Sequence, residues 1–445
     1  MEKENAIVVG LDIGTTKICA IVGRKNEFGK LEILGMGSAP SEGVIGGVVI
    51  NIQNTVDSIK KAISIAEEAS NVSIEVVNVG IAGQHIKSTK LRGSLTRDNT
   101  DSEITPQDLE KLTEDMYKTV MPFGNEIIHV MPQLYTVDYN EGIKDPVGMS
   151  CVRLEGDFHV ITAHTSAINN INKCVVRAGL KIDELILEPI ASSLAVLSEE
   201  EKEAGVVLVD IGGGTTDVAL FYEGIIRHTA VIPFGGNIIT SDIQHGCNIM
   251  QKDAEKLKIQ FGSAIANEAN TDTVKIQGLR NRPGKEISIR NLEHIIQARM
   301  EEIIEMVYAE ILASGFENKL AAGLVITGGG ALLQNLKQLF EFMTGLDTRI
   351  GYPNEHLGKC KIEAIKSPMY ATGVGLVLSG FSSIDERDNK HSKYLAAEQQ
   401  QNKNSSKKSK EQSRQSLSFK NLSQTLTRSL QNFLLDDDIN DSRSY

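Results

Sequence analysis

The strongest constraint on the fold of this 445-residue chain is one short pattern that occurs twice. In residues 205–217 (GVVLVDIGGGTTD) an unbroken apolar run leads to Asp210, then to three glycines, two threonines and a second carboxylate. In residues 6–18 (AIVVGLDIGTTKI) a similar run leads to Asp12, then to a glycine and two threonines. Apolar runs of this kind predict buried strands, each ending in a tight turn. Two copies so far apart in the chain favour a duplicated domain that faces its own copy.

The composition of these turns favours an anion with a metal ion. Glycine lets a backbone approach a ligand closely, and the amide groups of such a turn can surround a phosphate. The aspartates would repel a bare phosphate, so a divalent cation is expected between carboxylate and phosphate. An ordinary glycine-rich hairpin remains an alternative for either copy taken alone. The chain has no Walker P-loop, and no dinucleotide fingerprint follows the first strand.

The two turns resemble phosphate loops 1 and 2 of the actin, Hsp70 and sugar-kinase ATPase superfamily. Further segments resemble the superfamily's first connector at Glu188-Pro189, its adenosine loop at residues 324–331 (LVITGGGA) and its second connector at residues 371–375 (ATGVG). The resemblance implies an α/β fold, the duplicated two-lobe actin-like (ribonuclease H-like) ATPase fold.

Within this superfamily, the chain resembles the FtsA family of bacterial cell-division proteins. The residues that carry the resemblance are His129, Pro132 and Asp138, followed by DPVGM at 145–149 and RLE at 153–155. They resemble the family's 1C insert, and residues 233–243 (PFGGNIITSDI) resemble the segment that opens its fourth subdomain. His129 and His159 have no ligand residue at metal spacing, which favours structural histidines over a metal site.

The resemblance also divides the chain into subdomains. The expected parts are 1A (1–86, 165–200 and 367–381), 1C (87–164), 2A (201–241 and 301–366), 2B (242–300), a flexible linker (382–416), an amphipathic helix (417–435) and an acidic tail (436–445).

The C-terminal region changes composition. Residues 382–416 are polar and charged, which predicts a disordered tether. Residues 417–435 regain an apolar stripe at helical spacing, which resembles the family's membrane-targeting helix. The expected membrane residues are Phe419, Leu422, Leu426, Leu430, Phe433 and Leu434. The acidic tail opposes binding to anionic lipid.

The whole chain limits the other classes of function. A net charge of −12 argues against nucleic-acid binding. Its five scattered cysteines favour a reducing cytoplasm. The N-terminus leaves no room for a signal peptide, and no apolar stretch is long enough to span a bilayer.

The resemblance implies an ATP-binding protein that uses Mg²⁺, with at most slow ATPase activity. Asp12 and Asp210 would hold Mg²⁺, through waters. Glu188 would orient the attacking water, and Asp210 would take part in catalysis through the metal. The expected ATP-binding residues are Asp12, Gly14, Thr15, Thr16, Lys17, Gly212, Gly213, Gly214, Thr215, Gly236, Asn237, Glu255, Lys258, Gly328, Gly329 and Gly330. Taken alone, a Glu and a Lys three residues apart on a helix, as Glu255 and Lys258 are, more often form a surface ion pair than a nucleotide contact.

By the same resemblance, the protein would polymerise on the inner face of the cytoplasmic membrane at the division septum. There it would tether the FtsZ ring and recruit later division proteins. It would bind the FtsZ C-terminal peptide through 2B, where Arg280, Arg282, Lys285 and Arg290 meet acidic groups or form only a solvated basic face. It would self-associate through 1C and bind an anionic membrane surface. The alternatives are a pilus-assembly actin homologue, a sugar-kinase-like phosphotransferase and an Hsp70-like chaperone.

Overall fold

The computed structural model describes residues 6–97, 103–278, 283–358 and 362–387. The chain divides into two units, residues 1–381 and 382–445. The first unit contains every strand and helices α1 to α9, and the helix that starts at residue 371 continues to residue 387, into the segment predicted as linker.

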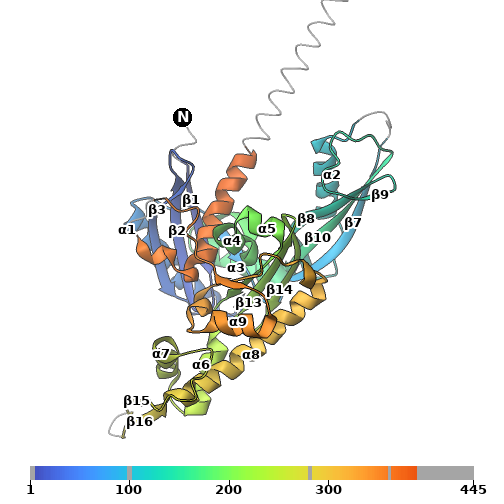
Figure 1. Ribbon diagram of the computed structural model, residues 1–445. Coiled ribbons are helices and arrows are strands. Elements are labelled where there is room, and N and C mark those ends of the chain that lie inside the picture. The colour runs from blue at the N-terminus through green and yellow to red at the C-terminus, as the bar shows by residue number, and fades with distance from the viewer. Residues whose placement is uncertain (1–5, 98–102, 279–282, 359–361, 388–445) are drawn as a thin grey trace, which may run out of the picture. The chain divides into compact units, whose positions relative to one another are not determined.

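The first lobe is built on a five-stranded mixed sheet (Figure 1). β1 and β2 form the predicted hairpin, β3 continues the antiparallel meander, and β6 and β11 extend the sheet in parallel from β1. The strands, in sheet order, are β11 (Lys181–Leu187), β6 (Val76–Ile81), β1 (Ile7–Ile13), β2 (Lys17–Lys25) and β3 (Leu31–Pro40). The associated helices are α1 (Ile52–Ser70) and α3 (Thr165–Arg177), and a small hairpin joins β4 (Val44–Ile45) to β5 (Val48–Val49).

The second lobe repeats this arrangement. β12, β13 and β14 form the antiparallel meander, and β17 and β18 extend the sheet in parallel from β12. The strands, in sheet order, are β14 (Ile225–Ile232), β13 (Thr216–Tyr222), β12 (Val206–Ile211), β17 (Leu324–Thr327) and β18 (Thr348–Ile350). Each lobe has a buried apolar core of its own. The same strand order in both lobes confirms the duplicated α/β fold predicted from the repeated turn.

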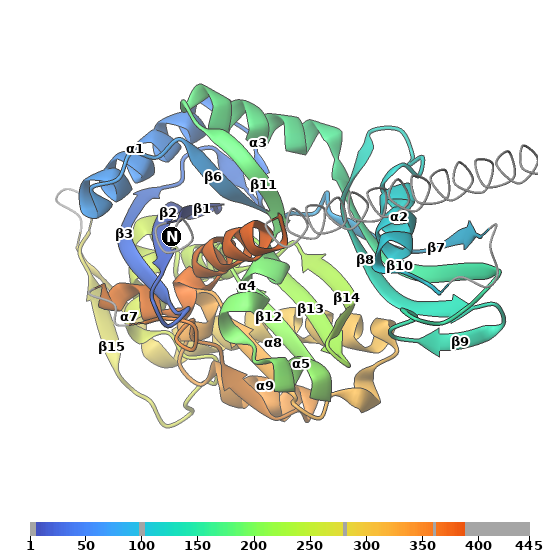
Figure 2. The ribbon, with the colours of Figure 1, turned by 90° about the horizontal axis from the view of Figure 1, so that it is seen from above.

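An additional four-stranded sheet lies between β6 and α3 in the chain (Figure 1). Its order is β7 (Lys87–Thr96), β10 (Arg153–His164), β8 (Asn125–Val137) and β9 (Asn140–Ile143). The sequence Thr-Pro-Gln-Asp at 105–108 predicts a helix start with Thr105 as N-cap, and α2 (Pro106–Tyr117) begins there, with a capping box between Thr105 and Asp108. We call residues 87–164 the insert. The insert also contacts the second lobe: Figure 2 shows β14 beside β10 and β8, and the Gln133 side-chain amide donates to the carbonyl of Ile226 (2.8 Å).

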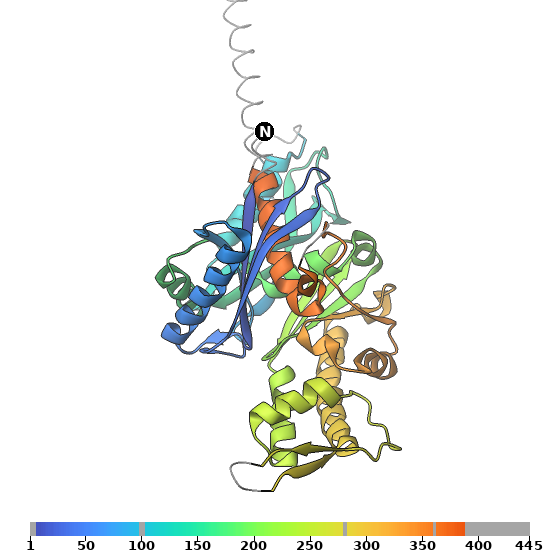
Figure 3. The ribbon, with the colours of Figure 1, turned by 90° about the vertical axis from the view of Figure 1, so that its left-hand side faces the viewer.

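The remaining helices of the first unit surround the second lobe and the chain segments that join the lobes (Figures 1 and 3). They are α4 (Glu188–Val196), α5 (Glu199–Ala204), α6 (Gly236–Cys247), α7 (Gln251–Phe261), α8 (Ile289–Ser314), α9 (Leu336–Thr344), a helix that starts at residue 371 and the short 3-10 turns η2 (Glu317–Lys319), η3 (Gly329–Leu332), η4 (Glu363–Lys366) and η5 (Pro368–Tyr370). α6, α7 and the hairpin of β15 (Thr273–Ile276) and β16 (Lys285–Ser288) gather at one end of α8 (Figure 3).

One predicted helix boundary is wrong. The apolar pattern of residues 332–343 predicts an amphipathic helix over that range, but α9 (Leu336–Thr344) begins only at Leu336. Its N-cap, Asn335, has φ +58°, and the glycine-rich η3 precedes it. A left-handed residue cannot lie inside an α-helix, so the helix starts after it.

Candidate functional site

Two hairpin turns face each other at the centre of the candidate site. One joins β1 to β2 and the other joins β12 to β13. A Cβ atom on Gly213 would lie 2.3 Å from Thr16 Cγ2, and one on Gly214 would lie 2.5 Å from Thr15 Oγ1. The second turn therefore meets the side chains of the first so closely that a side chain at Gly213 or Gly214 would force Thr16 or Thr15 to shift.

The third glycine segment packs against the second turn. β17 runs parallel to β12, and the chain turns at Gly328 with φ +82°. A Cβ atom on Gly328 would lie 2.3 Å from Asp210 Oδ1, and one on Gly330 would lie 2.3 Å from Ile211 Cγ2. These contacts bring the predicted adenosine loop beside the carboxylate of Asp210.

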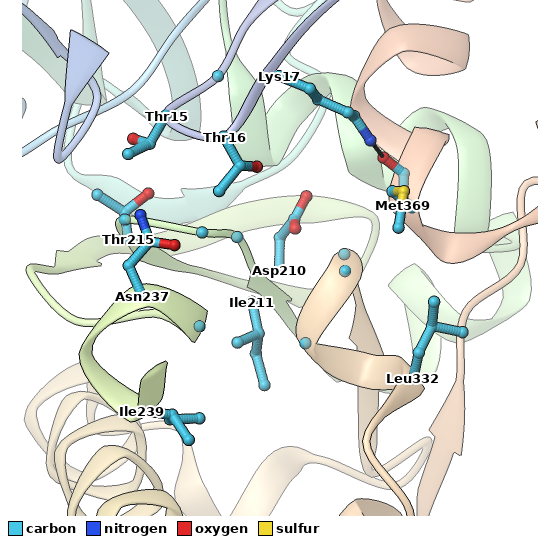
Figure 4. Close-up of a pocket in the computed structure, with 18 of the residues that line it drawn as sticks. Thr15, Thr16, Lys17, Asp210, Ile211, Thr215, Asn237, Ile239, Leu332 and Met369 are labelled. Carbon is cyan, nitrogen blue, oxygen red and sulfur yellow. Dashed lines mark hydrogen bonds between the residues drawn. The ribbon is translucent and has the colours of Figure 1, made fainter. Parts of the chain in front are cut away.

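The three segments surround one cavity of about 370 Å³ (Figure 4). Every residue predicted for ATP binding, metal holding or catalysis lines this cavity. The residues predicted from sequence that line it are Asp12, Gly14, Thr15, Thr16, Lys17, Glu188, Asp210, Gly212, Gly213, Gly214, Thr215, Gly236, Asn237, Glu255, Lys258, Gly328, Gly329 and Gly330. Their roles toward a ligand stay predictions.

Sequence reasoning missed the apolar part of the wall. The cavity is also lined by Ile13, Gly47, Ala82, Ile211, Asp217, Ile239, Ile259, Gly262, Met300, Leu332, Leu333, Gln334, Met369 and Thr372. The apolar side chains among them include Ile239, at the start of α6, Ile259 in α7 and Met300 in the middle of α8. They come from separate elements. Ile239 lies within the quoted segment 233–243, but nothing in the sequence marks any of the three as facing the cavity. A cavity with apolar walls and a few convergent polar groups suits a small organic ligand.

Acidic side chains crowd the polar part of the cavity. Burial raises the pKa of Asp12 to about 6, although Lys17 opposes the shift. Burial and the neighbouring Asp210 raise the pKa of Asp217 to about 8. Burial, together with the charges of Asp12, Asp217 and Asp210, holds the pKa of Glu188 well above its usual value. A cation in this space would remove much of this repulsion.

Two further observations bear on a cation. Asp217 is buried, its Oδ2 accepts a hydrogen bond from Thr215 Oγ1 (3.2 Å), and its Oδ1 has no partner among the described residues. Over the same residues, no group of three or more His, Cys, Asp or Glu side chains is placed to hold a metal ion directly. Magnesium keeps several waters and is commonly held by one or two carboxylates with substrate phosphates. The residues present therefore fit a hydrated Mg²⁺ that a nucleotide helps to bind.

Asp210 is held by hydroxyl groups. Its Oδ2 accepts hydrogen bonds from Ser192 Oγ (2.6 Å) and Thr372 Oγ1 (3.2 Å). Burial raises the pKa of Asp210, and these two hydrogen bonds oppose that shift. Thr372 belongs to the second connector motif and Ser192 lies four residues after Glu188 of the first, but the sequence gives no sign that the two hydroxyls meet the same carboxylate.

Lys17 contacts the second connector region. Its Nζ donates to the carbonyl oxygen of Met369 (2.5 Å) and lies 4.1 Å from the centre of the Tyr370 ring (Figure 4 shows the hydrogen bond). Burial lowers the pKa of Lys17. The ammonium group of Lys17, one of the predicted ATP-binding residues, is thus bound to a backbone carbonyl in this structure.

Glu255 and Lys258 form the ion pair that their spacing suggested and also line the cavity. Their side chains lie 2.8 Å apart. Lys258 Nζ also donates to the carbonyl of Gly236 (2.8 Å), and Thr240 Oγ1 bonds to Glu255. These contacts fix α7 against the start of α6. The backbone N–H of Asn237 donates to the carbonyl of Gly213 (2.8 Å), which joins α6 to the second turn.

The two histidines singled out in the sequence have structural contacts. His129 Nε2 accepts a hydrogen bond from the backbone amide of Leu187 (3.0 Å), which ties the insert to the first connector. His159 Nε2 lies 3.1 Å from Thr229 Oγ1 in β14. Burial lowers the pKa of each histidine to about 4, so both are neutral at pH 7.

Comparisons with known proteins agree with this architecture. The family model "Cell division protein FtsA" matches residues 207–375, and "SHS2 domain inserted in FTSA" matches residues 83–162. The chain is 41% identical over 375 residues to the cell division protein FtsA of Pseudomonas aeruginosa, covering 84% of this chain and 89% of the relative. It is 38% identical over 379 residues to that of Neisseria meningitidis, covering 85% and 91%.

The chain belongs to the FtsA family of cell division proteins. Among solved structures, a PilM–PilN type IV pilus biogenesis complex matches with a TM-score of 0.61 at 17% identity, covering 84% of this chain and 98% of that one. This likeness concerns the fold and agrees with the expected actin-like architecture. The relatives named above, unlike the pilus protein, share enough sequence to establish the family, so the pilus-assembly alternative is set aside.

Part of what the sequence predicted lies outside the described residues. This applies to the linker beyond residue 387, the amphipathic helix with its membrane residues, the acidic tail, and Arg280 and Arg282 of 2B. Within the described residues, no helix is long and apolar enough to cross a membrane.

Proposed function

We propose that this FtsA-family protein binds ATP with Mg²⁺ in the cavity between its lobes. The observation that carries the proposal is the convergence of two Asp-centred turns, one from each copy of the duplicated fold, with a third glycine segment on one cavity. A nucleotide phosphate with its metal requires a backbone that can approach it closely, amide groups that can face it, and buried carboxylates.

In this proposal each wall of the cavity has a separate role. The two turns, with Thr15 and Thr215, bind the phosphates, and Asp12 and Asp210 hold the hydrated metal. Bound Mg²⁺ supplies positive charge that offsets the phosphates and the crowded carboxylates. Gly328, with the neighbouring glycines and the apolar side chains beside it, contacts the adenosine.

Glu188 is the proposed general base for a slow hydrolysis. It lines the cavity at the first residue of α4, beside the carboxylates of both turns. A raised pKa brings a carboxyl group closer to the range in which a base accepts a proton at neutral pH. We expect turnover to be slow, near or below the lower end of the usual range for enzymes.

Membership of the FtsA family supports a role in cell division. We infer that the protein acts at the septum on the inner face of the cytoplasmic membrane, where it polymerises through the insert, tethers the FtsZ ring and recruits later division proteins. These finer statements rest on the resemblance of the sequence motifs to the family.

Subdomain 2B is the proposed site for the FtsZ C-terminal peptide. Two of its predicted basic residues are described: Lys285 donates to the carbonyl of Cys247 (2.5 Å), whereas Arg290 is exposed at the start of α8. Arg290 is therefore the better candidate for an acidic peptide. Arg290→Glu should weaken binding of the FtsZ peptide in a fluorescence-anisotropy titration, with Lys275→Glu as a control on β15. Equal affinities of wild type and Arg290→Glu would remove Arg290 from the proposed contact.

The amphipathic segment at residues 417–435 is the proposed membrane anchor. A helix of this composition should lie in the plane of the lipid interface with its apolar face buried. Phe433→Asp should release the full-length protein from vesicles containing anionic lipid in a sedimentation assay, while ATP binding stays unchanged. Co-sedimentation of the variant at the wild-type level would show that the segment is not the anchor.

The central experiment on the proposed site is nucleotide binding by Asp210→Ala. The substitution removes the carboxylate that adjoins the second and third glycine segments. We expect Mg·ATP affinity to fall by about 100-fold in calorimetry, the upper end for loss of a group that positions a metal. Asp57→Ala, at an exposed position on α1, is the matched control and should bind as the wild type does. Wild-type affinity in Asp210→Ala would contradict the assignment of the second turn.

A further inference from the structure

A buried hydroxyl pair connects the two chain segments that join the lobes. Ser192 lies in α4, which follows β11, and Thr372 lies in the first turn of the helix that starts at residue 371. Their hydroxyl oxygens are 3.0 Å apart, and both reach Oδ2 of Asp210, at 2.6 and 3.2 Å. All three side chains are buried. One oxygen of the carboxylate is therefore fixed by two helices that are distant from each other in the sequence.

The two helices cross at this point with almost no space between their backbones. A Cβ atom on Gly375 would lie 1.8 Å from the carbonyl oxygen of Ala191. Gly375 is one turn beyond Thr372, and Ala191 immediately precedes Ser192. The hydroxyl pair thus lies at a close-packed helix crossing, beside Asp210 of β12.

We propose that Ser192 and Thr372 are positioning residues that orient the carboxylate of Asp210 toward the metal shell of the nucleotide. This inference rests on the proposed ATP–Mg²⁺ function and assigns a role to two residues that are not among the predicted ATP-binding residues. Figure 4 shows the Asp210 side chain directed from its strand toward the side of the cavity where Thr16 lies.

The hydrogen count supports the assignment. Each hydroxyl has one proton, and that of Ser192 is donated to Asp210 Oδ2. Thr372 lies within reach of both Ser192 and Asp210, so its proton goes to one of these two oxygens. When Asp210 is ionised, both hydroxyls can serve it as donors or as a donor chain. Neutral donors fix the group without cancelling its charge, so that charge remains available to a cation.

The chain contains a matched control. Ser193 is the next residue of α4 and is buried like Ser192. Its hydroxyl donates to the carbonyl of Ile190 (2.7 Å) in the same helix and not to Asp210. A general loss of helix packing should appear in Ser193→Ala as well as in Ser192→Ala. A loss of carboxylate orientation should appear only in Ser192→Ala.

The test measures ATP affinity by calorimetry across a series of Mg²⁺ concentrations and again in EDTA, on the full-length protein. For Ser192→Ala we expect the Mg²⁺ concentration that gives half-maximal enhancement of ATP affinity to rise by about 10-fold. Affinity in EDTA should stay as in the wild type, because the hydroxyls act through the metal site. Thr372→Val, which keeps the shape but removes the donor, should shift the requirement in the same direction. Thr372→Ser, which keeps the hydroxyl, should show the wild-type Mg²⁺ requirement, and so should Ser193→Ala.

Thermal unfolding of each variant shows whether it is folded, and Thr372→Val serves as the second test if Ser192→Ala unfolds. An unshifted Mg²⁺ requirement in a folded Ser192→Ala or Thr372→Val protein would overturn this inference alone. So would an equal shift in Ser193→Ala. Absence of ATP binding by the wild type would overturn both this inference and the proposed function.

Discussion

The two Asp-centred turns occupy equivalent places in the duplicated fold but hold their carboxylates differently. In the first lobe, Asp12 pairs across the hairpin with Cys19 and lies near the charge of Lys17. In the second, Asp210 pairs across the hairpin with Asp217 and accepts hydrogen bonds from neutral hydroxyls. Duplication therefore conserved the backbone of the turn and changed its chemistry. The comparison suggests that the first turn contributes mainly charge balance and the second mainly orientation.

The largest expected effect concerns the spacing of the turns. Gly213→Val should lower ATP affinity by about 100-fold or more, because its side chain collides with Thr16 and forces the turns apart. The collision involves Thr16 Cγ2, which serine lacks. Gly213→Ala should therefore bind ATP more tightly in a Thr16→Ser background than alone, as measured by calorimetry. If the double variant bound ATP no more tightly than Gly213→Ala alone, the closeness of the turns would not be what limits binding.

The next prediction compares how much Mg·ATP affinity is lost when Asp210 or Asp12 loses its charge. Asp210→Asn should weaken Mg·ATP binding by about 100-fold, and Asp12→Asn by only about 10-fold. In Asp12→Asn the ammonium of Lys17 loses a counter-charge and becomes available to the phosphates, which offsets part of the loss. Calorimetry in the same Mg²⁺ buffer compares the two. Equal losses would contradict the proposed division between charge balance and orientation.

A smaller effect concerns the pH dependence of folding stability, to which the titration of Asp217 contributes. Its pKa rises from 3.8 to about 8 on folding, so the folded protein binds more protons than the unfolded chain between these values. Stability of the nucleotide-free protein should therefore fall as pH rises through this window, by at most about 1.4 kcal/mol per pH unit. Asp217→Asn should reduce the difference between the midpoint temperatures of thermal unfolding at pH 6 and at pH 8. An unchanged slope in the variant would show that Asp217 is not the group responsible.

The smallest expected effect on affinity concerns Glu188, which belongs to neither turn. Glu188→Gln should leave ATP binding within about 2-fold of wild type while lowering turnover by about 100-fold, as expected for loss of a general base. Phosphate release under saturating Mg·ATP provides the measurement. Wild-type turnover in the variant would exclude Glu188 from the reaction.

The residues predicted for the site could be picked out from the sequence because they lie in local motifs, and their roles stay predictions. A glycine turn after a buried strand has few possible conformations, so Gly213 and Asp210 could be placed from thirteen consecutive residues, 205–217. The duplicated fold followed because the same pattern occurred again at Asp12. These are short-range constraints, and the structure brings the residues that obey them onto one cavity.

Other features of the site depend on long-range packing, which the sequence could not reveal. Ser192 and Thr372 meet only because two helices cross at Gly375, and Met300 reaches the cavity from the middle of α8. β7 was also missed, since its residues are mostly exposed or half-buried and carry no continuous apolar run. Contact of the insert with β14 likewise joins strands more than 60 residues apart in the chain.

The most direct test of the central claim is a calorimetric titration of the full-length wild-type protein with ATP, first with Mg²⁺ and then in EDTA. If the facing turns form a nucleotide site, one ATP should bind per chain, with affinity at least about 10-fold higher when Mg²⁺ is present. An absence of saturable binding under both conditions, or equal affinity with and without the metal, would contradict the account.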